Sequence, residues 1–375
     1  MKNRILEITY HGGTGGVAVL LLNLAKHLKE DFDIEVCFAN SLGPVAEDIK
    51  SLGVKTYCLN LKSGFDLIGA LRLKRFLERK RYDLVHLHYL TPLIRLGVFI
   101  SHPRATIMTE HGGVKGEKER NRWFLTKHIH RLLRNTVDLY TTVSEENRQV
   151  MVNNGICCDE KCLVIYNGID LDEFHPYGAD TVAIKRKLGI PLRKVIVGTV
   201  RGLTPKMGID HFLLALREVL RKNGNVFGVI VGDGPLREEL ERLAESLGIR
   251  EDLSFLGTQR NIPELLSLFD IFVMPSVWET FGIAAAEAMA TEIPVVAYLD
   301  AGGLSELIGE ENTGKLVADR DPRLLAESIL ELIQQPEERR AIGKRARKRI
   351  STYFDMKKIS QEYKEIYEKT IRVAQ

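Results

Sequence analysis

The chain has 375 residues, of which 45% are hydrophobic and 27% charged, and its formal net charge is +3. A chain of this length can form two domains with a core each, and no nucleic-acid-binding motif accompanies its basic residues. No signal peptide precedes the first predicted strand, and the apolar stretches are too short to span a bilayer. We therefore expect a cytoplasmic protein that does not bind nucleic acid.

Strand and helix patterns alternate along the whole chain, which predicts an α/β protein with a doubly wound parallel sheet in each of two domains. We expect the first domain at residues 1–172, a linker at 173–193 and the second domain at 194–355. Apolar runs predict strands at 4–10, 34–39, 55–59, 84–88, 105–109, 139–143, 163–165, 195–200, 226–231, 253–256, 271–274, 295–297 and 315–317. Helical patterns predict helices at 209–220, 283–290, 322–335, 336–352 and 357–373.

The stretch between Glu279 and Glu287 gives the strongest indication of a binding site. It follows an apolar strand and a turn, and after Gly282 it becomes a helix of small residues. The first N–H groups of a helix have no partner within it, so such a helix start attracts anions, phosphate above all. Two glutamates on a helix are commonly solvated, but the residues between these two are small or apolar, and a glutamate in such a face needs a partner. The pattern indicates a nucleotide-sugar site.

A second anion site is predicted after the strand at 195–200. Arg201 and Lys206 follow the carboxyl end of this strand, where doubly wound sheets place their ligands. A guanidinium and an ammonium group at this spacing can bind one diphosphate from two sides. The pair by itself is equally compatible with two solvated cations in a loop. The neighbouring glutamate motif favours the alternative, a phosphate-binding site.

These residues, taken in order, resemble a known family. Arg201 and Lys206 followed by Glu279-x7-Glu287 are similar to the signature of retaining glycosyltransferase family 4, a GT-B family that uses nucleotide sugars. The likeness continues in order over residues 4–355. It includes Gly15-Gly16-Val-Ala-Val-Leu-Leu-Leu-Asn-Leu-Ala25, Asp83-Leu-Val-His-Leu-His88, Glu110-His111-Gly112, Asn167-Gly168-Ile169-Asp170, Gly232-Asp-Gly-Pro235 and Gly302-Gly303…Glu306.

The resemblance implies two Rossmann-like domains that face each other across a cleft, with a terminal helix at 356–375 packed back on the first domain. Gly15 and Gly16 lie in the loop after the first strand, where glycines let the backbone approach the sugar diphosphate. The same loop matches the dinucleotide fingerprint in its Ala variant. That fingerprint also needs an acidic residue at the end of the second strand, which ends Phe38-Ala39-Asn40, so an NAD site is the weaker alternative.

The implied roles of the basic residues follow from charge. Breaking the anomeric C–O bond of a nucleotide sugar leaves a diphosphate with growing negative charge. The resemblance implies that Arg201 and Lys206 bind this diphosphate and stabilise it as it leaves. The backbone N–H groups of Phe281, Gly282 and Ile283 can add to the positive charge there.

The implied roles of the other polar residues concern the sugars. Glu279 accepts hydrogen bonds from hydroxyls of the donor sugar, and Glu287 holds the ribose hydroxyls. His111 matches the family histidine that hydrogen-bonds the donor sugar, with a strand-end histidine satisfied by backbone as the alternative. For His86 and His88 we expect that only one can face the cleft, and we favour a place in the core for both.

Many transferases neutralise the leaving group with a metal ion held by Asp-x-Asp. The chain contains Asp31-x-Asp33, Asp170-x-Asp172 and Asp319-x-Asp321, but none accompanies the glycine-rich turns and basic residues, and Asp319 is expected to cap a helix. The cysteines of Cys157-Cys158-x3-Cys162 lack a fourth zinc ligand, and five cysteines fit a reduced compartment. We predict catalysis without a metal or any other cofactor.

The charge of the first domain allows a further partner. Residues 1–171 hold 24 lysines and arginines against 19 acidic residues, with basic clusters at Arg72–Arg81 and Arg104–Arg134. Such clusters are either solvated helix faces or docking sites for an anionic acceptor or membrane surface. Peripheral contact with the inner face of the membrane is therefore the alternative to a freely diffusing protein.

The predicted reaction moves a sugar from a nucleotide sugar to a hydroxyl acceptor. We take UDP as the donor nucleotide because it is the commonest in the resembled family, and we expect polysaccharide or glycolipid assembly for the same reason. A UDP-sugar epimerase of the same fold and a non-catalytic nucleotide-sugar-binding protein are the alternatives. A sugar phosphorylase has less support, since nothing indicates a pyridoxal phosphate site.

Overall fold

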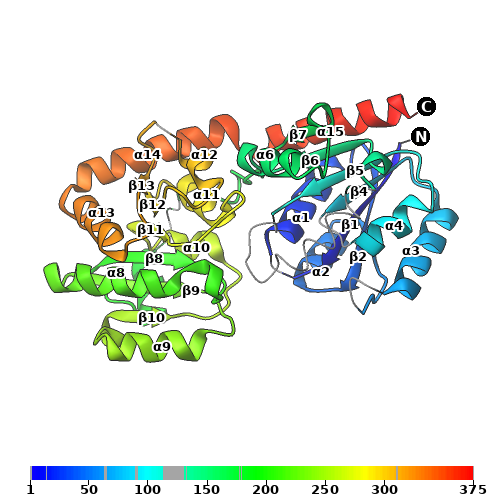
Figure 1. Cartoon of the computed structure of the whole chain (residues 1–375). Helices are drawn as coiled ribbons and strands as arrows, with labels where there is room; N and C mark the ends of the chain where they lie inside the picture. Colours follow the sequence, from blue (N-terminus) through cyan, green and yellow to red (C-terminus); the bar gives the residue numbers. More distant parts are fainter. Residues whose placement is uncertain are drawn as a thin grey trace. The chain divides into compact units, whose positions relative to one another are not determined.

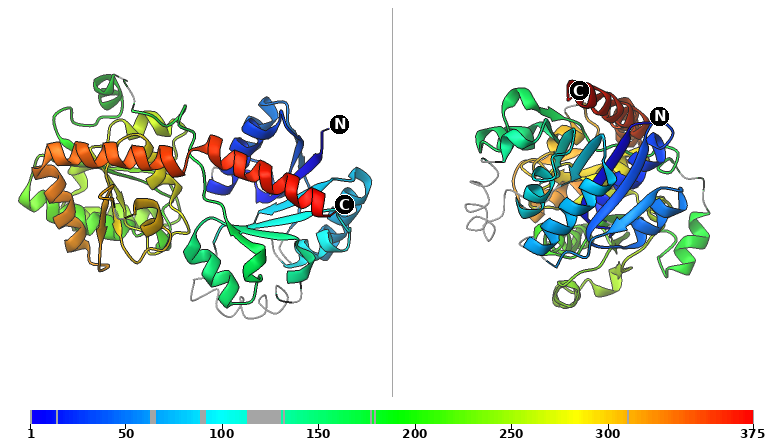
Figure 2. Two further views of the ribbon diagram at one scale, coloured as in Figure 1. Left: turned by 90° about the horizontal axis from the view of Figure 1, so that it is seen from above. Right: turned by 90° about the vertical axis from the view of Figure 1, so that its right-hand side faces the viewer.

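The computed structural model describes residues 2–13, 15–62, 66–88, 92–112, 131, 133–176, 178, 180–309 and 311–374. The chain divides into two compact units (Figures 1 and 2). One unit is formed by Met1–Gly168 together with Met356–Gln375, and the other by Ile169–Asp355. The second unit therefore begins inside the Asn167-Gly168-Ile169-Asp170 motif, and the terminal helix belongs to the first unit.

The first unit is built around a seven-stranded parallel sheet with the order β3-β2-β1-β4-β5-β6-β7 in the described part of the chain. The inner strands of this sheet are almost fully buried because helices cover both faces, and the edge strands are partly exposed. The strands are β1 (Arg4–His11), β2 (Asp33–Ser41), β3 (Lys55–Cys58), β4 (Leu84–His88), β5 (Thr106–Glu110), β6 (Leu139–Thr142) and β7 (Cys162–Val164). The helices are α1 (Gly16–Leu28), α2 (Pro44–Ser51), α3 (Leu67–Lys80), α4 (Pro92–Phe99), α6 (Glu145–Asn153) and α15 (Met356–Val373).

Two apolar cores lie on the two faces of this sheet. Side chains of α1, α2 and α15 form one core with the strands, and side chains of α3, α4 and α6 form the other. Helix α15 joins the first core because Ile359, Tyr363, Ile366 and Tyr367 recur at helical spacing and are buried. The last residues of the chain are thereby packed against a domain that begins at the first strand (Figure 2).

The second unit is built around a six-stranded parallel sheet with the order β10-β9-β8-β11-β12-β13 in the described residues. Its strands are β8 (Val195–Val200), β9 (Val226–Val231), β10 (Leu253–Phe255), β11 (Ile271–Met274), β12 (Val295–Tyr298) and β13 (Lys315–Val317). Its helices are α7 (Thr181–Lys187), α8 (Ile209–Lys222), α9 (Arg237–Ser246), α10 (Ile262–Leu266), α11 (Ile283–Ala290), α12 (Leu304–Ile308), α13 (Pro322–Gln334) and α14 (Pro336–Tyr353). Short 3-10 turns occur at η1 (Arg134–Thr136), η2 (Asp159–Lys161), η3 (Pro205–Met207) and η4 (Arg250–Asp252).

The fold class predicted from the sequence, two doubly wound parallel sheets, is confirmed. Every predicted strand is present, with ends shifted by at most two residues, because most of them are short buried apolar runs. One local prediction is wrong: Asp321, not Asp319, caps α13, since its carboxylate accepts from the Arg323 N–H at 2.8 Å. In the described part of the chain, no helix combines the length and apolar character needed to cross a bilayer.

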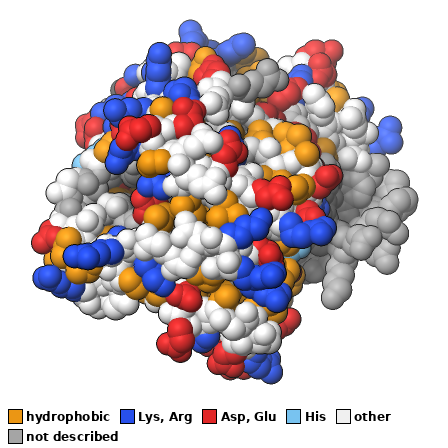
Figure 3. Space-filling view, turned by 90° about the vertical axis from the view of Figure 1, so that its left-hand side faces the viewer, with side chains coloured by type: hydrophobic (Ala, Val, Ile, Leu, Met, Phe, Trp, Pro, Cys, Tyr) orange, Lys and Arg blue, Asp and Glu red, His pale blue; other side chains and the backbone are white. Residues whose placement is uncertain are grey.

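Charges on the second unit are mixed. The face in Figure 3, on the side of α8, α9 and α13, carries basic and acidic side chains interspersed with one another. The excess of basic residues over acidic ones thus belongs to the first domain, as its composition indicates.

Candidate functional site

The strand order of each sheet shows where a ligand can bind. In the second unit the chain runs from β8 outward to β9 and β10, and then returns to β11 on the other side of β8. The connections after β8 and β11 therefore leave in opposite directions, which opens a crevice at the carboxyl ends of these two strands. The same reversal falls between β1 and β4 in the first unit. The predicted site residues fall into two groups, one at each of these switch points.

Arg201 and Glu279 contact each other at the switch point of the second unit. Arg201 follows β8 directly, and its Nη2 donates to Oε1 of Glu279, which follows β11 after a turn. The Arg201 side chain is 7% exposed and that of Glu279 is 18% exposed. Two residues predicted to bind different parts of a ligand thus form a nearly buried ion pair with each other.

Three polar atoms on or near the ends of β8 and β11 have no hydrogen-bond partner among the described residues. Nε of Arg201, Oγ of Ser276 and Oγ1 of Thr199 are all buried, and the described residues offer none of them a hydrogen-bond partner. Buried polar groups in proteins are nearly always paired, and the exceptions call for an explanation such as a missing ligand. Sequence reasoning missed Thr199 and Ser276, because a small hydroxyl residue near a strand end gives no signal by itself.

The loop that carries Lys206 is held against the turn after β11. Lys206 lies in η3, its carbonyl accepts from the Val277 N–H at 3.0 Å, and its side chain is exposed. Gly208 follows with φ +63°, and a Cβ atom there would lie 1.9 Å from the carbonyl oxygen of Pro275. Only glycine allows this close approach of the two backbones, so Gly208 fixes the loop of Lys206 beside the turn that leads to Glu279.

The backbone of Glu279 is held by the loop after β12. Its N–H donates to the Ala301 carbonyl and its carbonyl accepts from the Gly303 N–H, each at 2.9 Å. Gly302 has φ +78°, and a Cβ atom there would lie 2.3 Å from the Glu279 carbonyl oxygen. The Gly302-Gly303 motif, which the sequence analysis noted without a role, therefore positions Glu279.

Helix α11 begins next to this ion pair. Gly282 caps it with φ +90°, and no side chain accepts from its first N–H groups. Phe281 is buried and packs edge-on against Phe354 at 5.4 Å between ring centroids, so only its backbone is available to a ligand. Ile283 is the first residue of the helix. The start of α11 therefore presents backbone N–H groups without a helical partner, as an anion site requires.

Glu287 lies one turn inside α11 and is half-buried. Burial raises the pKa of Glu287 to about 8, and the nearby carboxylate of Glu173 adds to the increase. The sign follows from the charge: a buried carboxyl group prefers its neutral form, so Glu287 is mostly protonated at neutral pH. A ligand that donates hydrogen bonds to the carboxylate would favour the ionised form.

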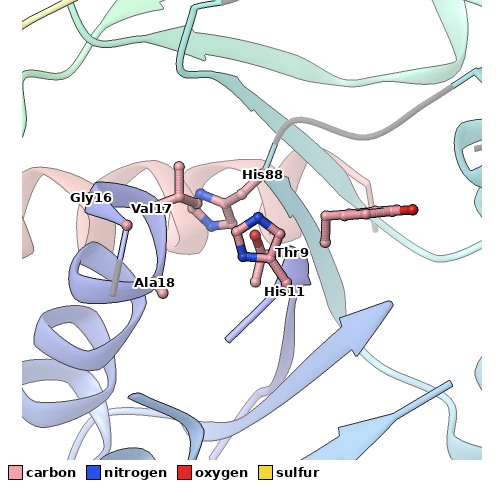
Figure 4. Close-up of a pocket in the computed structure, with 8 residues that line it drawn as sticks. Thr9, His11, Gly16, Val17, Ala18 and His88 are labelled. Atoms are coloured by element: carbon pink, nitrogen blue, oxygen red, sulfur yellow. The ribbon is translucent and has the colours of Figure 1, made fainter. Parts of the chain in front are cut away.

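Gly15 and Gly16 line a pocket of about 150 Å³ at the switch point of the first unit (Figure 4). Gly15 caps α1, and a Cβ atom at this position would meet nothing within 4 Å. The wall of the pocket combines the end of β1, the glycine loop, the start of α1 and one side chain of β4. Its lining residues are Thr9, Tyr10, His11, Gly15, Gly16, Val17, Ala18 and His88.

His111 follows β5, is half-buried, and contacts the buried His88. Its Nε2 lies 2.9 Å from Nδ1 of His88, and the two rings are stacked with centroids 5.2 Å apart. The expectation that only one of His86 and His88 can face the cleft is wrong in its premise. Side chains two residues apart lie on the same face of a strand, and these two rings lie 4.0 Å apart there. The place of both in the interior is as expected, since each is fully buried.

Glu7 of β1 joins these histidines, and the sequence analysis missed it. Its Oε2 lies 2.7 Å from Nε2 of His88 and 3.0 Å from Nδ1 of His86. The signal was available: Glu7 is a lone charged residue within the apolar strand Ile5-Leu6-Glu7-Ile8, and a buried charge needs partners.

Glu7, His86 and His88 are also the group of described residues whose ligand atoms, all within 4.8 Å of one another, could hold a metal ion. Each of these atoms already has a hydrogen-bond partner. Tyr367 donates to Oε1 of Glu7 at 2.7 Å, and Nε2 of His86 lies 2.6 Å from Oγ1 of Thr109. The arrangement fits a closed hydrogen-bond network, which a metal ion could enter only by breaking several of these bonds.

Two family models match this chain. The model described as "Glycosyltransferase Family 4" matches residues 14–173, and that described as "Glycosyl transferases group 1" matches residues 180–349. The chain belongs to glycosyltransferase family 4. It is a glycosyltransferase of the hexosyltransferase type, and its two sheets are those of the GT-B fold. The family predicted from Arg201, Lys206 and the two glutamates is thereby confirmed.

Relatives of this glycosyltransferase match nearly its whole length. It is 25% identical to the Escherichia coli UDP-Gal:alpha-D-GlcNAc-diphosphoundecaprenol alpha-1,3-galactosyltransferase, covering 90% of this chain and 89% of the relative. It is 26% identical to N-acetyl-alpha-D-glucosaminyl L-malate synthase of Bacillus anthracis, and the match covers 99% of this chain and 98% of the relative. The crystal structure of Anabaena HepE in complex with UDP and glucose matches with a TM-score of 0.85 and 22% identity, covering 98% of this chain and 100% of that one.

The close approach at Gly208 can be tested by comparing alanine substitutions at Gly208 and Gly189. Gly189 has nearly the same φ, +68°, but a Cβ atom there would meet nothing within 4 Å. Gly189→Ala should cost about 1–2 kcal/mol of unfolding free energy, the strain of a left-handed alanine. Gly208→Ala should cost about 3 kcal/mol or more, because the Pro275 carbonyl must also move. Urea unfolding measures both, and equal losses would contradict the close approach.

Proposed function

We propose that this protein is a retaining glycosyltransferase that moves a sugar from UDP to a hydroxyl acceptor without a metal ion. The observation that carries the proposal is the contact between Arg201 and Glu279 at the switch point of β8 and β11, beside the start of α11. It brings a guanidinium, a carboxylate and the backbone N–H groups of a helix start to one place. A diphosphate linked to a sugar needs these three kinds of group.

In the proposed complex the diphosphate lies between Arg201, Lys206 and the N–H groups of Phe281, Gly282 and Ile283. The phosphate competes with Glu279 for the guanidinium of Arg201, which frees the Glu279 carboxylate to accept from hydroxyls of the donor sugar. The buried Nε of Arg201, without a partner in the described chain, supplies a further donor.

The proposed chemistry keeps the anomeric configuration. The C–O bond between the sugar and the diphosphate breaks, and the acceptor oxygen forms its bond to the anomeric carbon on the same face. The proton of the acceptor hydroxyl passes to the departing phosphate oxygen. Arg201, Lys206 and the start of α11 stabilise the charge of the leaving group, as preorganised donors do in many enzymes. Support for metal independence comes from this number of protein donors.

The donor and acceptor are proposed from different observations. The E. coli relative is a UDP-Gal-dependent transferase by name, and the Anabaena structure contains UDP, which supports UDP as the donor nucleotide. The acceptors named in the relatives differ, from a lipid diphosphate sugar to L-malate, at nearly equal identity. We propose a hydroxyl acceptor in glycolipid or polysaccharide assembly, at the cytoplasmic side of the membrane.

The function is tested by incubating the protein with UDP-, GDP- and ADP-sugars, with and without lipid-linked sugars, oligosaccharides and hydroxy acids as acceptors. We expect UDP release only when an acceptor is present, no effect of excess EDTA, and a product with the anomeric configuration of the donor by NMR. Lys206→Ala should lower kcat/KM by about tenfold to a thousandfold. The exposed Lys222→Ala on α8 should not change it.

Each part of the proposal fails on its own outcome. Conversion of the UDP-sugar to an epimer would indicate an epimerase. Binding of the UDP-sugar without turnover in the presence of any acceptor would indicate a non-catalytic protein. Loss of activity in EDTA that Mg²⁺ or Mn²⁺ restores would disprove metal independence. Equal activity of the Lys206 and Lys222 variants would remove the phosphate role of Lys206.

A calorimetric prediction separates the two glutamates. If ribose hydroxyls donate to ionised Glu287, UDP affinity should rise about tenfold from pH 7 to pH 9, because the competent fraction grows as the pH passes the pKa of about 8. Glu287→Gln should bind UDP more weakly and lose this pH dependence. Glu279→Gln should keep the pH dependence of UDP binding and should not weaken UDP itself, because it removes the competitor of the phosphate for Arg201, but it should weaken binding of the intact UDP-sugar. A pH-independent wild type would contradict the ribose role.

We propose that helix α3 docks the protein on anionic membranes. One face of α3 exposes Leu67, Ile68 and Leu71 near its start, with 61%, 66% and 44% of each side chain exposed. Arg72 and Arg75 continue this exposed face toward the basic end of the helix. Apolar side chains beside arginines are typical of helices that lie in a membrane interface. Most of the second predicted cluster, Arg104–Arg134, lies outside the described residues.

Vesicle sedimentation tests the role of α3. Anionic vesicles should bind the protein at low salt and release it as salt shortens the screening length to about 8 Å, while neutral vesicles should bind little. Reversing Arg72, Arg75 and Arg79 to Glu should remove most of the binding. The matched reversal of Arg340, Lys344 and Lys348 on α14 should remove little, and equal effects of the two triple variants would contradict docking through α3.

A further inference from the structure

Two methionine sulfurs hold the guanidinium of Arg201, in addition to its contact with Glu279. Its Nη1 donates to Sδ of Met274 at 3.1 Å, and its Nη2 donates to Sδ of Met207. Met274 is the last residue of β11, and Met207 is the last residue of η3, directly after Lys206. A thioether sulfur is a weak hydrogen-bond acceptor. Both contacts are therefore weak compared with a charge-assisted bond between a guanidinium and a phosphate oxygen.

The two methionines differ in their access to solvent. Met274 is fully buried, whereas Met207 is half-buried. The other methionines that the structure describes are fully buried as well, namely Met108, Met151, Met289 and Met356. Within the described part of the chain, Met207 is thus the methionine most accessible to a small molecule in solution. Because oxidation of a sulfur atom depends on such access, the fold favours oxidation at Met207 over the buried methionines.

Oxidation changes a methionine from a weak acceptor into a strong one. Hydrogen peroxide transfers one oxygen atom to the thioether sulfur, which gives up two electrons, while the O–O bond breaks and the other oxygen leaves as water. The new S–O bond is strongly polar, so the sulfoxide oxygen accepts hydrogen bonds much as an amide carbonyl does. Two thiols reverse the step, since they return the sulfur to the thioether and release water and a disulfide.

We propose that Met207 is a reversible oxidation site that controls donor binding, and that its sulfoxide oxygen binds the guanidinium of Arg201 in place of the diphosphate. The effect on donor binding rests on the proposed function, whereas the oxidation of Met207 and its contact with Arg201 do not. The next residue, Gly208, fixes this loop against Pro275. The oxygen is therefore added at a sulfur that already contacts the guanidinium.

Two substitutions at Met207 separate the added oxygen from the loss of the sulfur. Met207→Leu nearly conserves the side-chain volume and cannot be oxidised. Met207→Gln places an amide carbonyl oxygen close to the position of the sulfoxide oxygen. Without any oxidant, the glutamine variant should bind UDP about tenfold more weakly than the leucine variant, because its carbonyl oxygen competes with the phosphate for Arg201.

The oxidation experiment treats the full chain with hydrogen peroxide and then with dithiothreitol. The second reagent reduces disulfides and sulfenic acids of the five cysteines but leaves methionine sulfoxide in place. Peptide mass spectrometry should show oxidation of Met207 before that of the buried methionines. Calorimetry should then show about tenfold weaker UDP binding by the oxidised wild type, and the two methionine sulfoxide reductases together should restore the affinity.

Met274→Leu is the matched control, because it removes the other sulfur contact of Arg201 and keeps Met207. This variant should lose UDP affinity on oxidation as the wild type does, whereas Met207→Leu should bind UDP equally well before and after peroxide. Each protein is compared with its own untreated sample, so an effect of the substitution itself does not enter the comparison.

Methionine methyl ¹³C NMR gives a readout that needs no nucleotide. The sulfoxide signal of Met207, assigned by its absence in Met207→Leu, should shift in oxidised Arg201→Lys, because this variant lacks the guanidinium that the sulfoxide oxygen binds.

Three outcomes would overturn the proposal. These are equal oxidation of Met207 and the buried methionines in the folded protein, unchanged UDP affinity of the oxidised wild type, and an equal loss of affinity in peroxide-treated Met207→Leu. If the untreated wild type binds no UDP, the proposed function fails. The mass spectra and the NMR comparison then still decide whether Met207 is the oxidation site and whether its sulfoxide contacts Arg201.

Discussion

The constraint on which the whole arrangement depends is the reversal of strand order within each parallel sheet. Parallel strands need long crossover connections, and these lie on the two faces of the sheet. Where two neighbouring strands send their connections in opposite directions, the carboxyl ends of both stay uncovered. Between β8 and β11 this leaves Arg201 and Glu279 facing each other. Between β1 and β4 the strand register places Glu7 beside His86 and His88 in the interior.

The charged side chains at the two switch points differ in how completely they are paired. In the second unit the charged groups are few, partly exposed and accompanied by unpaired donors and hydroxyls, so the site is incomplete by itself. In the first unit the carboxylate of Glu7 is enclosed by two imidazoles and the Tyr367 hydroxyl, and every one of these contacts is satisfied. Incomplete pairing suits a surface that exchanges ligands. Complete pairing suits a network that holds one side chain in one state.

Glycines at left-handed positions hold together the loops that form the site of the second unit. Gly208, Gly282 and Gly302 all lie around Arg201 and Glu279, and each carries a positive φ where a side chain would overlap a neighbour. Such backbone geometry brings three loops from three strands within hydrogen-bond distance of one another. Backbone hydrogen bonds and close approaches therefore hold these loops at the site.

The sequence by itself determined the strands, the ends of the five predicted helices to within two residues, and the family. It also predicted the residues of the second site, and their roles stay predictions. Each of these rests on local patterns: short apolar runs, a glycine before a helix of small residues, and two cations after a strand. Only the tertiary structure decided which of these residues meet. Arg201 and Glu279 are 78 positions apart, Glu7 and His88 are 81 apart, and Glu7 and Tyr367 are 360 apart. Contacts over such separations depend on strand order and register, which local hydrophobic periodicity does not encode. The sequence analysis therefore identified Glu279 and His111 but not Arg201 and His88 as the side chains that contact them.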